Sequence, residues 1–208
     1  MSRYIESVCK LCRREQTKLF LKGDKCYTKC VLEKRPTTPG MAKPQRSKPS
    51  AYSIRLREKQ KLRRLISMNE RPFERLVEKA SGAKEASGDF LLRSLELRLD
   101  NIVRRIGVAT SLKTARQLVL HGHVKVNGTL VNIPSYAVKP GDTIALSGKL
   151  KENVGVKLSL DTAKRLNQRP TFVEFNEETL SAKLLRAPER AEMSFPVTEQ
   201  LIIEYYSK

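Results

Sequence analysis

The positive charge of this 208-residue chain is confined to two blocks, which limits the segments that can build a hydrophobic core. Residues 1–64 hold 19 lysines and arginines against 5 acidic residues, and residues 95–150 hold 8 against 3. Residues 65–94 and 151–208 each carry no net charge, so they can supply scaffold. A charge that served solubility alone would be spread more evenly. Two concentrated basic surfaces on a chain with a pI near 10.0 therefore indicate a polyanionic partner, most often nucleic acid.

The composition narrows the expected mode of binding and the location of the protein. Tryptophan is absent and aromatic residues make up 6%, so a binding mode built mainly on base stacking is not expected. The basic groups would then contact phosphate and sugar, with the shape of the nucleic acid setting specificity. The chain has no long apolar run and no apolar stretch at its start, so we expect neither a membrane span nor export, and a cytoplasmic location.

All four cysteines, Cys9, Cys12, Cys26 and Cys30, fall in the first thirty residues. Two residues separate the first pair and three separate the second, and such short-spaced pairs can supply a tetrahedral Zn²⁺ site from two turns. The segment has too few apolar residues to fold alone, and metal closure would supply that stability. One structural Zn²⁺ is the expected cofactor. An iron–sulfur cluster, disulfides or free thiols remain the alternatives.

The rest of the first basic block reads as a linker followed by a helix. Residues 31–53 are rich in proline and lysine, which predicts an extended arm that either stays solvated or becomes ordered on RNA. Residues 51–66 predict a helix in which Glu58 is the sole acid. We interpret its cations as phosphate contacts, with a plain surface helix as the alternative: Arg55, Arg57, Lys59, Lys61, Arg63 and Arg64. A neutral amphipathic helix is expected over 70–80.

The second basic block predicts two helices followed by a small sheet. The first helix covers 90–106 and ends at Gly107, and the second begins near Ser111 and ends at Gly122. Asn127-Gly128 lies between two short β-prone runs, 124–126 and 129–131, and is a strong hairpin signal. Residues 143–146 complete an expected three-stranded sheet.

Residues 97–146 resemble the S-four-type RNA-binding domain. The resemblance rests on Arg98-Leu99-Asp100-Asn101, on residues 114–119, on His121-Gly122-His123-Val124 and on residues 126–128 and 139–142. It implies that the second helix and the loop after it bind structured RNA, through Ser111, Lys113, Arg116, Gln117, His121, His123 and Lys125. Lys113 and Arg116 lie one turn apart and could follow one phosphate backbone. The histidines could instead be turn or packing residues, and Asp100 is expected to partner an arginine.

The resemblance extends over nearly the whole chain, which is similar to the bacterial small-subunit ribosomal protein four family in its zinc-bearing branch. Residues 3–4, 11–15, 19–23, 56–61 and 199–208 carry it. It implies an α+β fold in which the RNA-binding module is inserted into a mostly helical domain behind an N-terminal zinc-binding segment. The expected boundaries are 1–45 for the zinc segment and linker, 46–96 and 151–208 for the helical domain, and 97–150 for the module. Because residues 200–206 are apolar and β-prone, we expect a C-terminal strand there.

The resemblance also implies a function. Members are structural constituents of the small ribosomal subunit and bind the 5′ domain of its RNA early in assembly. They lie beside small-subunit proteins five and three where messenger RNA enters and contribute to translational accuracy, and some repress their own message. Further RNA-binding candidates are Arg3, Lys10, Arg13, Arg14 and Lys22, and, near the messenger RNA channel, Lys43, Arg46 and Lys48.

An enzyme is not expected, although two other classes share the module. Arg98-Leu99-Asp100 superficially resembles a pseudouridine synthase triplet, but no separate catalytic domain follows it. A free-standing RNA-binding regulator would not need the cysteine segment and the basic helix. Residues 147–160 carry fewer cations than the family pattern, so an RNA contact there is not expected.

Overall fold

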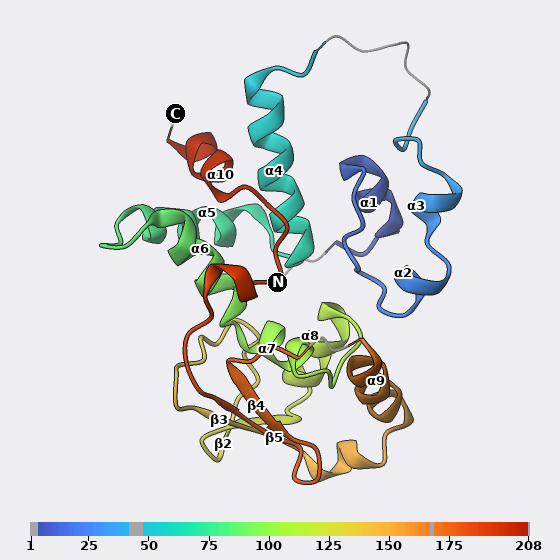
Figure 1. Ribbon diagram of the computed structural model, residues 1–208, viewed down its shortest axis with the longest axis vertical. Coiled ribbons are helices and arrows are strands. Elements are labelled where there is room, and N and C mark those ends of the chain that lie inside the picture. Colours follow the sequence, from blue (N-terminus) through green and yellow to red (C-terminus); the bar gives the residue numbers. More distant parts are fainter. Residues whose placement is uncertain (1–3, 42–47, 167–168, 208) are drawn as a thin grey trace. The chain divides into compact units, whose positions relative to one another are not determined.

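The computed structural model describes residues 4–41, 48–166 and 169–207 (Figure 1). The chain divides into two compact units. It enters the second unit at Arg93 and leaves it at Ser194, so that the second unit is inserted into the first along the sequence. This insertion is longer than the expected module of residues 97–150, because two further strands after residue 150 join its sheet.

The described part of the first unit is helical (Figure 1). Ser50 begins the long basic helix, since its Oγ accepts a hydrogen bond from the backbone N–H of Ser53 at 3.2 Å. Phe73, Val77 and Ala80 form the buried stripe of the next helix, which confirms the amphipathic helix expected there. The helices of this unit are α1 (Cys9–Glu15), α2 (Lys25–Thr28), α3 (Val31–Lys34), α4 (Ala51–Leu65), α5 (Glu70–Ser81) and α10 (Glu199–Tyr206), and α6 (Ser87–Glu96) leads into the second unit.

The C-terminal strand predicted at 200–206 is wrong, because this segment forms α10. Ile202 and Tyr206 are four residues apart, and this spacing places both on one side of a helix. Ile202 is fully buried, Tyr206 packs beside Phe73, and Glu204 pairs with Arg55 of α4 at 2.7 Å. Packing against α4 and α5 therefore overrides the β propensity of the isoleucines and tyrosines.

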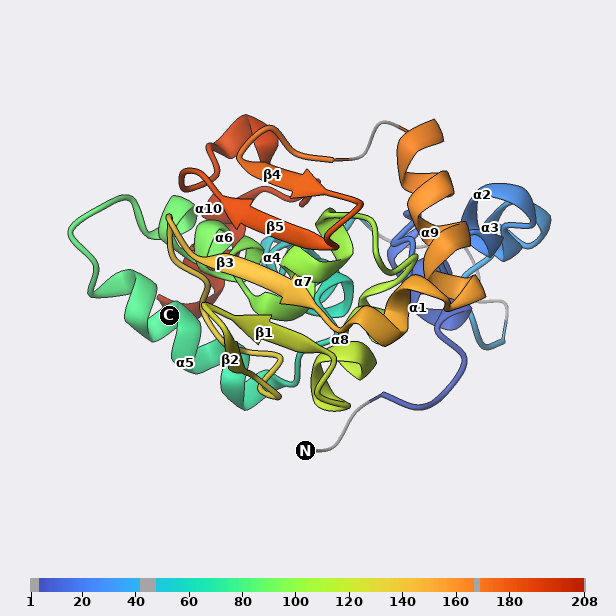
Figure 2. The same cartoon turned by 90° about the horizontal axis from the view of Figure 1, so that it is seen from below.

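The second unit is built on a sheet of five antiparallel strands in the order β2-β1-β3-β5-β4 (Figure 2). The three strands predicted within 124–146 form and pair as expected, but Ser181, Ala182 and Lys183 pair with β3 and extend the sheet to five strands. The elements are α7 (Leu99–Arg105), α8 (Leu112–Leu120), β1 (Val124–Val126), β2 (Thr129–Leu130), β3 (Thr143–Leu146), η1 (Gly148–Lys151), α9 (Val154–Arg165), β4 (Val173–Asn176), β5 (Ser181–Leu184) and η2 (Arg190–Glu192).

The single helix predicted over 90–106 is broken in the structure at Leu97 and Arg98. Arg98 has extended backbone and forms an isolated β-bridge with Ala137. The carbonyl of Leu97 accepts from the N–H of Val138 at 2.9 Å, so the break gains backbone hydrogen bonds that a continuous helix would forgo. Gly107 ends α7 as predicted, with a φ of +91° that favours glycine.

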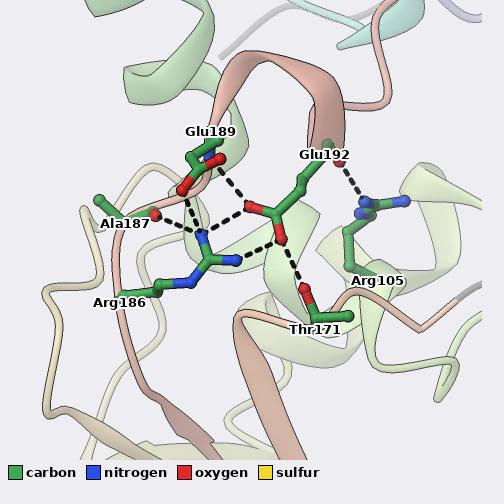
Figure 3. A network of polar contacts seen from close by, with 6 residues as sticks. All are labelled: Arg105, Thr171, Arg186, Ala187, Glu189 and Glu192. Atoms are coloured by element: carbon green, nitrogen blue, oxygen red, sulfur yellow. Dashed lines mark hydrogen bonds and ion pairs between the residues drawn. The ribbon is translucent and has the colours of Figure 1, made fainter.

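A network of hydrogen bonds and ion pairs holds the segment after β5, which includes η2, in place (Figure 3). The guanidinium of Arg186 donates to both carboxylate oxygens of Glu192, at 2.7 and 2.6 Å. Thr171 Oγ donates to the same carboxylate at 2.5 Å, and Arg105 donates to the backbone carbonyl of Glu192 at 2.7 Å. The hydrogen bonds from Arg186 and Thr171 lower the pKa of Glu192 to about 2. The network thus connects α7, the segment before β4, the segment after β5 and η2 within the second unit.

Candidate nucleic-acid interface

Helix α8 and strand β1 present an exposed cationic surface. Ser111 caps the helix, with its Oγ accepting from the N–H of Thr114 at 3.2 Å, as the sequence predicted. The side chains at Lys113 and Gln117 are exposed and lie four residues apart on one face. His121 follows at the same spacing, and Lys125 projects from β1 between two buried valines. We name Lys113, Gln117, His121 and Lys125 the α8 row.

Arg116 differs from the rest of the predicted α8 set, because it is only 9% exposed. Its guanidinium lies 3.6 Å from the carboxylate of Asp100, which is fully buried. Arg98 donates to the two oxygens of that carboxylate at 3.1 and 3.0 Å. Asp100 is thus a structural partner for arginine, as predicted. Arg116 holds α8 to α7 in this arrangement, so its expected role in following a phosphate backbone does not fit its position.

The turn after α8 brings His121 and His123 together on either side of Gly122. Their ring centroids are 6.4 Å apart. His121 is exposed, whereas His123 is half-buried and its backbone carbonyl accepts from the N–H of Ser147 at 2.9 Å. His121 is therefore the more accessible of the two for a partner.

The Asn127-Gly128 hairpin forms as predicted, with both residues at positive φ. Asn127 Nδ2 donates to Asp142 Oδ1 at 2.8 Å, and Asn127 Oδ1 accepts from the N–H of Thr143 at 2.9 Å. These bonds fix the hairpin that carries Lys125 and keep that lysine at a defined position beside α8.

The cations of α4 lie in a different setting, because each pairs with a carboxylate and most of these carboxylates come from other helices. Glu15 of α1 lies 3.2 Å from Arg57 and also pairs with Arg64, although it is 2% exposed. Burial raises the pKa of Glu15 and opposes the effect of these two arginines. The remaining pairs are Arg55–Glu204 at 2.7 Å, Lys59–Glu70 at 2.6 Å, Lys61–Glu58 at 2.7 Å and Arg63–Glu70 at 3.3 Å.

Lys59 is the α4 cation least suited to phosphate contact, since it is only 4% exposed. Its ammonium lies 4.3 Å from the centre of the Tyr205 ring as well as beside Glu70. Burial alone would raise the pKa of Glu70, but hydrogen bonds from Lys59 and Tyr206 lower it overall. Lys59 therefore joins α4, α5 and α10 inside the first unit, contrary to the exposed role expected of it.

The four thiols share one segment of short helices. The backbone N–H of Lys22 donates to Cys26 Sγ at 3.3 Å, a contact that suits a thiolate or metal ligand. Burial raises the pKa of both Cys12 and Cys26, and the neighbouring thiols act in the same direction. Over the described ranges, which include all four cysteines, no group of three or more histidine, cysteine or acidic side chains is arranged to hold a metal.

The cations predicted near the cysteines differ in whether their side chains make polar contacts within the chain. Lys10 pairs with Glu6 at 3.8 Å, and Arg13 Nε donates to the carbonyl of Thr37 at 2.8 Å. Arg14 and Lys22 are exposed. Lys25 and Lys29 are also exposed, and they were not among the predicted RNA contacts.

The predicted contacts of the linker are only partly visible. Lys48 is exposed ahead of α4. Arg3, Lys43 and Arg46 lie outside the described residues. Across the residues that the structure describes, no helix combines the length and apolar character needed to cross a membrane.

Comparison with known proteins covers the whole chain. Residues 3–96 match the family described as Ribosomal protein S4/S9 N-terminal domain, and residues 97–144 match the S4 domain. The small ribosomal subunit protein uS4 of Thermus thermophilus is 48% identical over 210 residues, which span all of both chains. The uS4 protein of Thermodesulfovibrio yellowstonii and the uS4A protein of Symbiobacterium thermophilum are each 48% identical over 209 residues, again across both full chains.

The inserted unit, its exposed α8 row and the S4 domain match define an S4-domain protein of the RNA-binding class. Its relatives are named as ribosomal components and not as enzymes, in agreement with the expectation that the protein is not an enzyme. The chain belongs to the uS4 family of small ribosomal subunit proteins.

Proposed function

We propose that the protein is a structural constituent of the small ribosomal subunit in the cytoplasm, and that it binds the RNA of that subunit through the α8 row. The observation that carries this is the exposed arrangement of Lys113, Gln117, His121 and Lys125 within the unit that matches the S4 domain. The exposed cations Lys113 and Lys125 supply phosphate contacts, and the capped start of α8 adds backbone donors.

The RNA target is the 5′ domain of small-subunit ribosomal RNA, bound early in assembly. The basic first block supplies a second set of contacts, in which Arg14, Lys22 and Lys48 are exposed. Two linked surfaces raise the overall affinity through effective concentration, provided that the RNA presents both sites at a matching distance. This requirement favours one folded RNA over random sequences.

The family resemblance extends the proposal to neighbours. Small-subunit proteins five and three would lie beside the chain where messenger RNA enters, with a contribution to translational accuracy. Lys48, together with Lys43 and Arg46, would face the messenger RNA. Binding of the protein to its own message would repress translation.

The test is equilibrium binding to the 5′ domain RNA and to an equally long unrelated RNA at physiological salt. We expect a specificity ratio of about a thousand or more, as is typical of specific nucleic-acid readers. Equal affinity for the two RNAs would leave a sequence-blind RNA binder and would favour the free-standing regulator instead.

We also propose that Cys9, Cys12, Cys26 and Cys30 hold one structural Zn²⁺, as in the zinc-bearing branch of the family. The shared segment and the N–H donor to Cys26 Sγ support this. Metal analysis of the purified protein should give one zinc per chain, and visible absorption would instead indicate an iron–sulfur cluster. Chelation should increase amide exchange over residues 4–35 and spare the S4 unit; unchanged exchange would contradict the proposal.

A further inference from the structure

Two aromatic side chains lie exposed in the cysteine segment. The rings of Phe20 and Tyr27 have centroids 5.0 Å apart and planes inclined by 31°. Phe20 is 40% exposed and Tyr27 is 44% exposed. Aromatic rings gain much of their stabilising effect from burial, so a pair kept in water leaves apolar surface available to a partner.

The backbone around Phe20 turns this ring outward. Its neighbours Leu19 and Leu21 are 2% and 7% exposed and point inward. Phe20 itself has a φ of +48°, in the left-handed region that residues with a Cβ rarely adopt. Strained backbone of this kind concentrates at binding sites, where the surrounding structure holds it in place.

Three exposed lysines lie close in sequence to the two aromatic residues. Lys22 follows Phe20 by two residues, and Lys25 and Lys29 precede and follow Tyr27 by two. None of these three lysines forms an ion pair with a carboxylate within the part of the chain that the structure describes, and Asp24 is the acid between them. Planar apolar rings beside several ammonium groups match a nucleobase attached to a phosphate backbone.

We propose that Phe20 and Tyr27 stack against an unpaired nucleobase of the ribosomal RNA, while Lys22, Lys25 and Lys29 contact the phosphates that flank it. This inference rests on the proposed function, because it adds a base contact to the same RNA. The low aromatic content of the chain argued against base stacking as the main mode of RNA binding. A single stacked base needs no more than these two rings, so the two statements agree.

The first test measures binding of Phe20→Leu and Tyr27→Leu to the 5′ domain RNA over a range of salt concentrations. Leucine keeps apolar bulk and removes the aromatic face, so each variant should bind about tenfold more weakly with an unchanged salt slope. Tyr27→Phe keeps the ring and is the matched control, with affinity within about twofold of the wild type. Wild-type affinity in both leucine variants would overturn the stacking proposal.

A second variant keeps the proposal testable if leucine disturbs the fold of the segment. The chain contains no tryptophan, so Tyr27→Trp introduces a single fluorescent reporter. Stacking on a base should quench its emission when RNA is added. Val154→Trp, at a position 70% exposed on α9, should keep its emission and is the control. Bound RNA without quenching at position 27 would overturn the proposal.

The outcomes separate the two proposals. Suppose that the wild type binds 5′ domain RNA more tightly than unrelated RNA, and that the leucine variants bind it with wild-type affinity. In that case only the stacking inference fails. If the wild type does not discriminate, the proposed function fails and the stacking inference fails with it.

Discussion

Helix α4 and helix α8 carry the same types of basic residue in very different surroundings. Each of the six cations of α4 pairs with a carboxylate, and most of these acids come from α1, α5 and α10. In α8, Lys113 is exposed, whereas Arg116 is turned inward to Asp100. The number of basic residues in a helix is therefore no measure of its exposed positive charge, because the tertiary fold decides which cations remain at the surface.

The cations of the two units therefore fall into two groups: those that hold the fold together and those whose side chains are exposed. Lys59 and Arg116 are buried, and each joins helices through a buried or half-buried carboxylate. Arg98 pairs with the same Asp100, two residues along the chain. Lys113 and Lys125 remain exposed on the S4 unit. Substitution of a cation in the first group should lower stability, whereas substitution of an exposed cation should weaken RNA binding.

Asp100→Ala should give the largest effect. It leaves Arg98 and Arg116 buried without their carboxylate, which costs about 3–5 kcal/mol of unfolding free energy. Urea denaturation measures this change. Asp161→Ala, on the exposed face of α9, is the control and should change stability by less than about 0.5 kcal/mol. A loss below about 1 kcal/mol for Asp100→Ala would show that the arginines are not structurally dependent on it.

Lys113→Gln and Arg116→Gln should separate the accessible cation from the structural one. Lys113→Gln should weaken RNA binding several-fold and reduce the salt slope by about one unit, because one phosphate contact is lost. Arg116→Gln should instead lower the unfolding free energy by about 1–3 kcal/mol and leave the slope unchanged. Binding titrations from low to high salt measure the slopes, and an unchanged slope for Lys113→Gln would remove it from the phosphate contacts.

Arg63→Gln tests whether pairing reduces the contribution of α4 to RNA binding. Glu70 lies 3.3 Å from Arg63 and already compensates its charge. We expect the salt slope to fall by roughly half a unit or less. The same titration with Lys113→Gln provides the comparison. A full unit lost in both variants would erase the distinction between α4 and α8 and restore α4 as a phosphate-contacting helix.

The smallest effect concerns acid stability at Glu192. Its pKa in the folded protein is lowered to about 2 from an ordinary 4.5, so its contribution is present above pH 4.5 and is lost as pH falls toward 2. Glu192→Gln should flatten the fall of the melting temperature over this range by about 1–2 °C, since solvent screens the pair with Arg186. Glu152→Gln, at an exposed side chain outside this network, is the control and should follow the wild type.

Sequence patterns predicted the elements in which local signals agree with the final packing. The cap at Ser111 and the Asn127-Gly128 hairpin both formed as expected. Each depends on backbone geometry and hydrogen bonds within a few residues, which the sequence alone specifies. The charge blocks and the resemblance to the ribosomal protein family were also readable without a structure.

Long-range contacts decided the remainder. The segment 200–206 is β-prone but becomes a helix because it packs on α4 and α5, and β4 and β5 join the sheet through pairing with β3. The exposure and pairing of several cations depend on carboxylates distant in sequence, such as Glu15 for Arg64 and Glu204 for Arg55. Sequence thus determined the family, the local elements and the overall charge. Tertiary structure alone decided which charges are exposed, because the pairing energy of a buried ion depends on neighbours that only folding brings together.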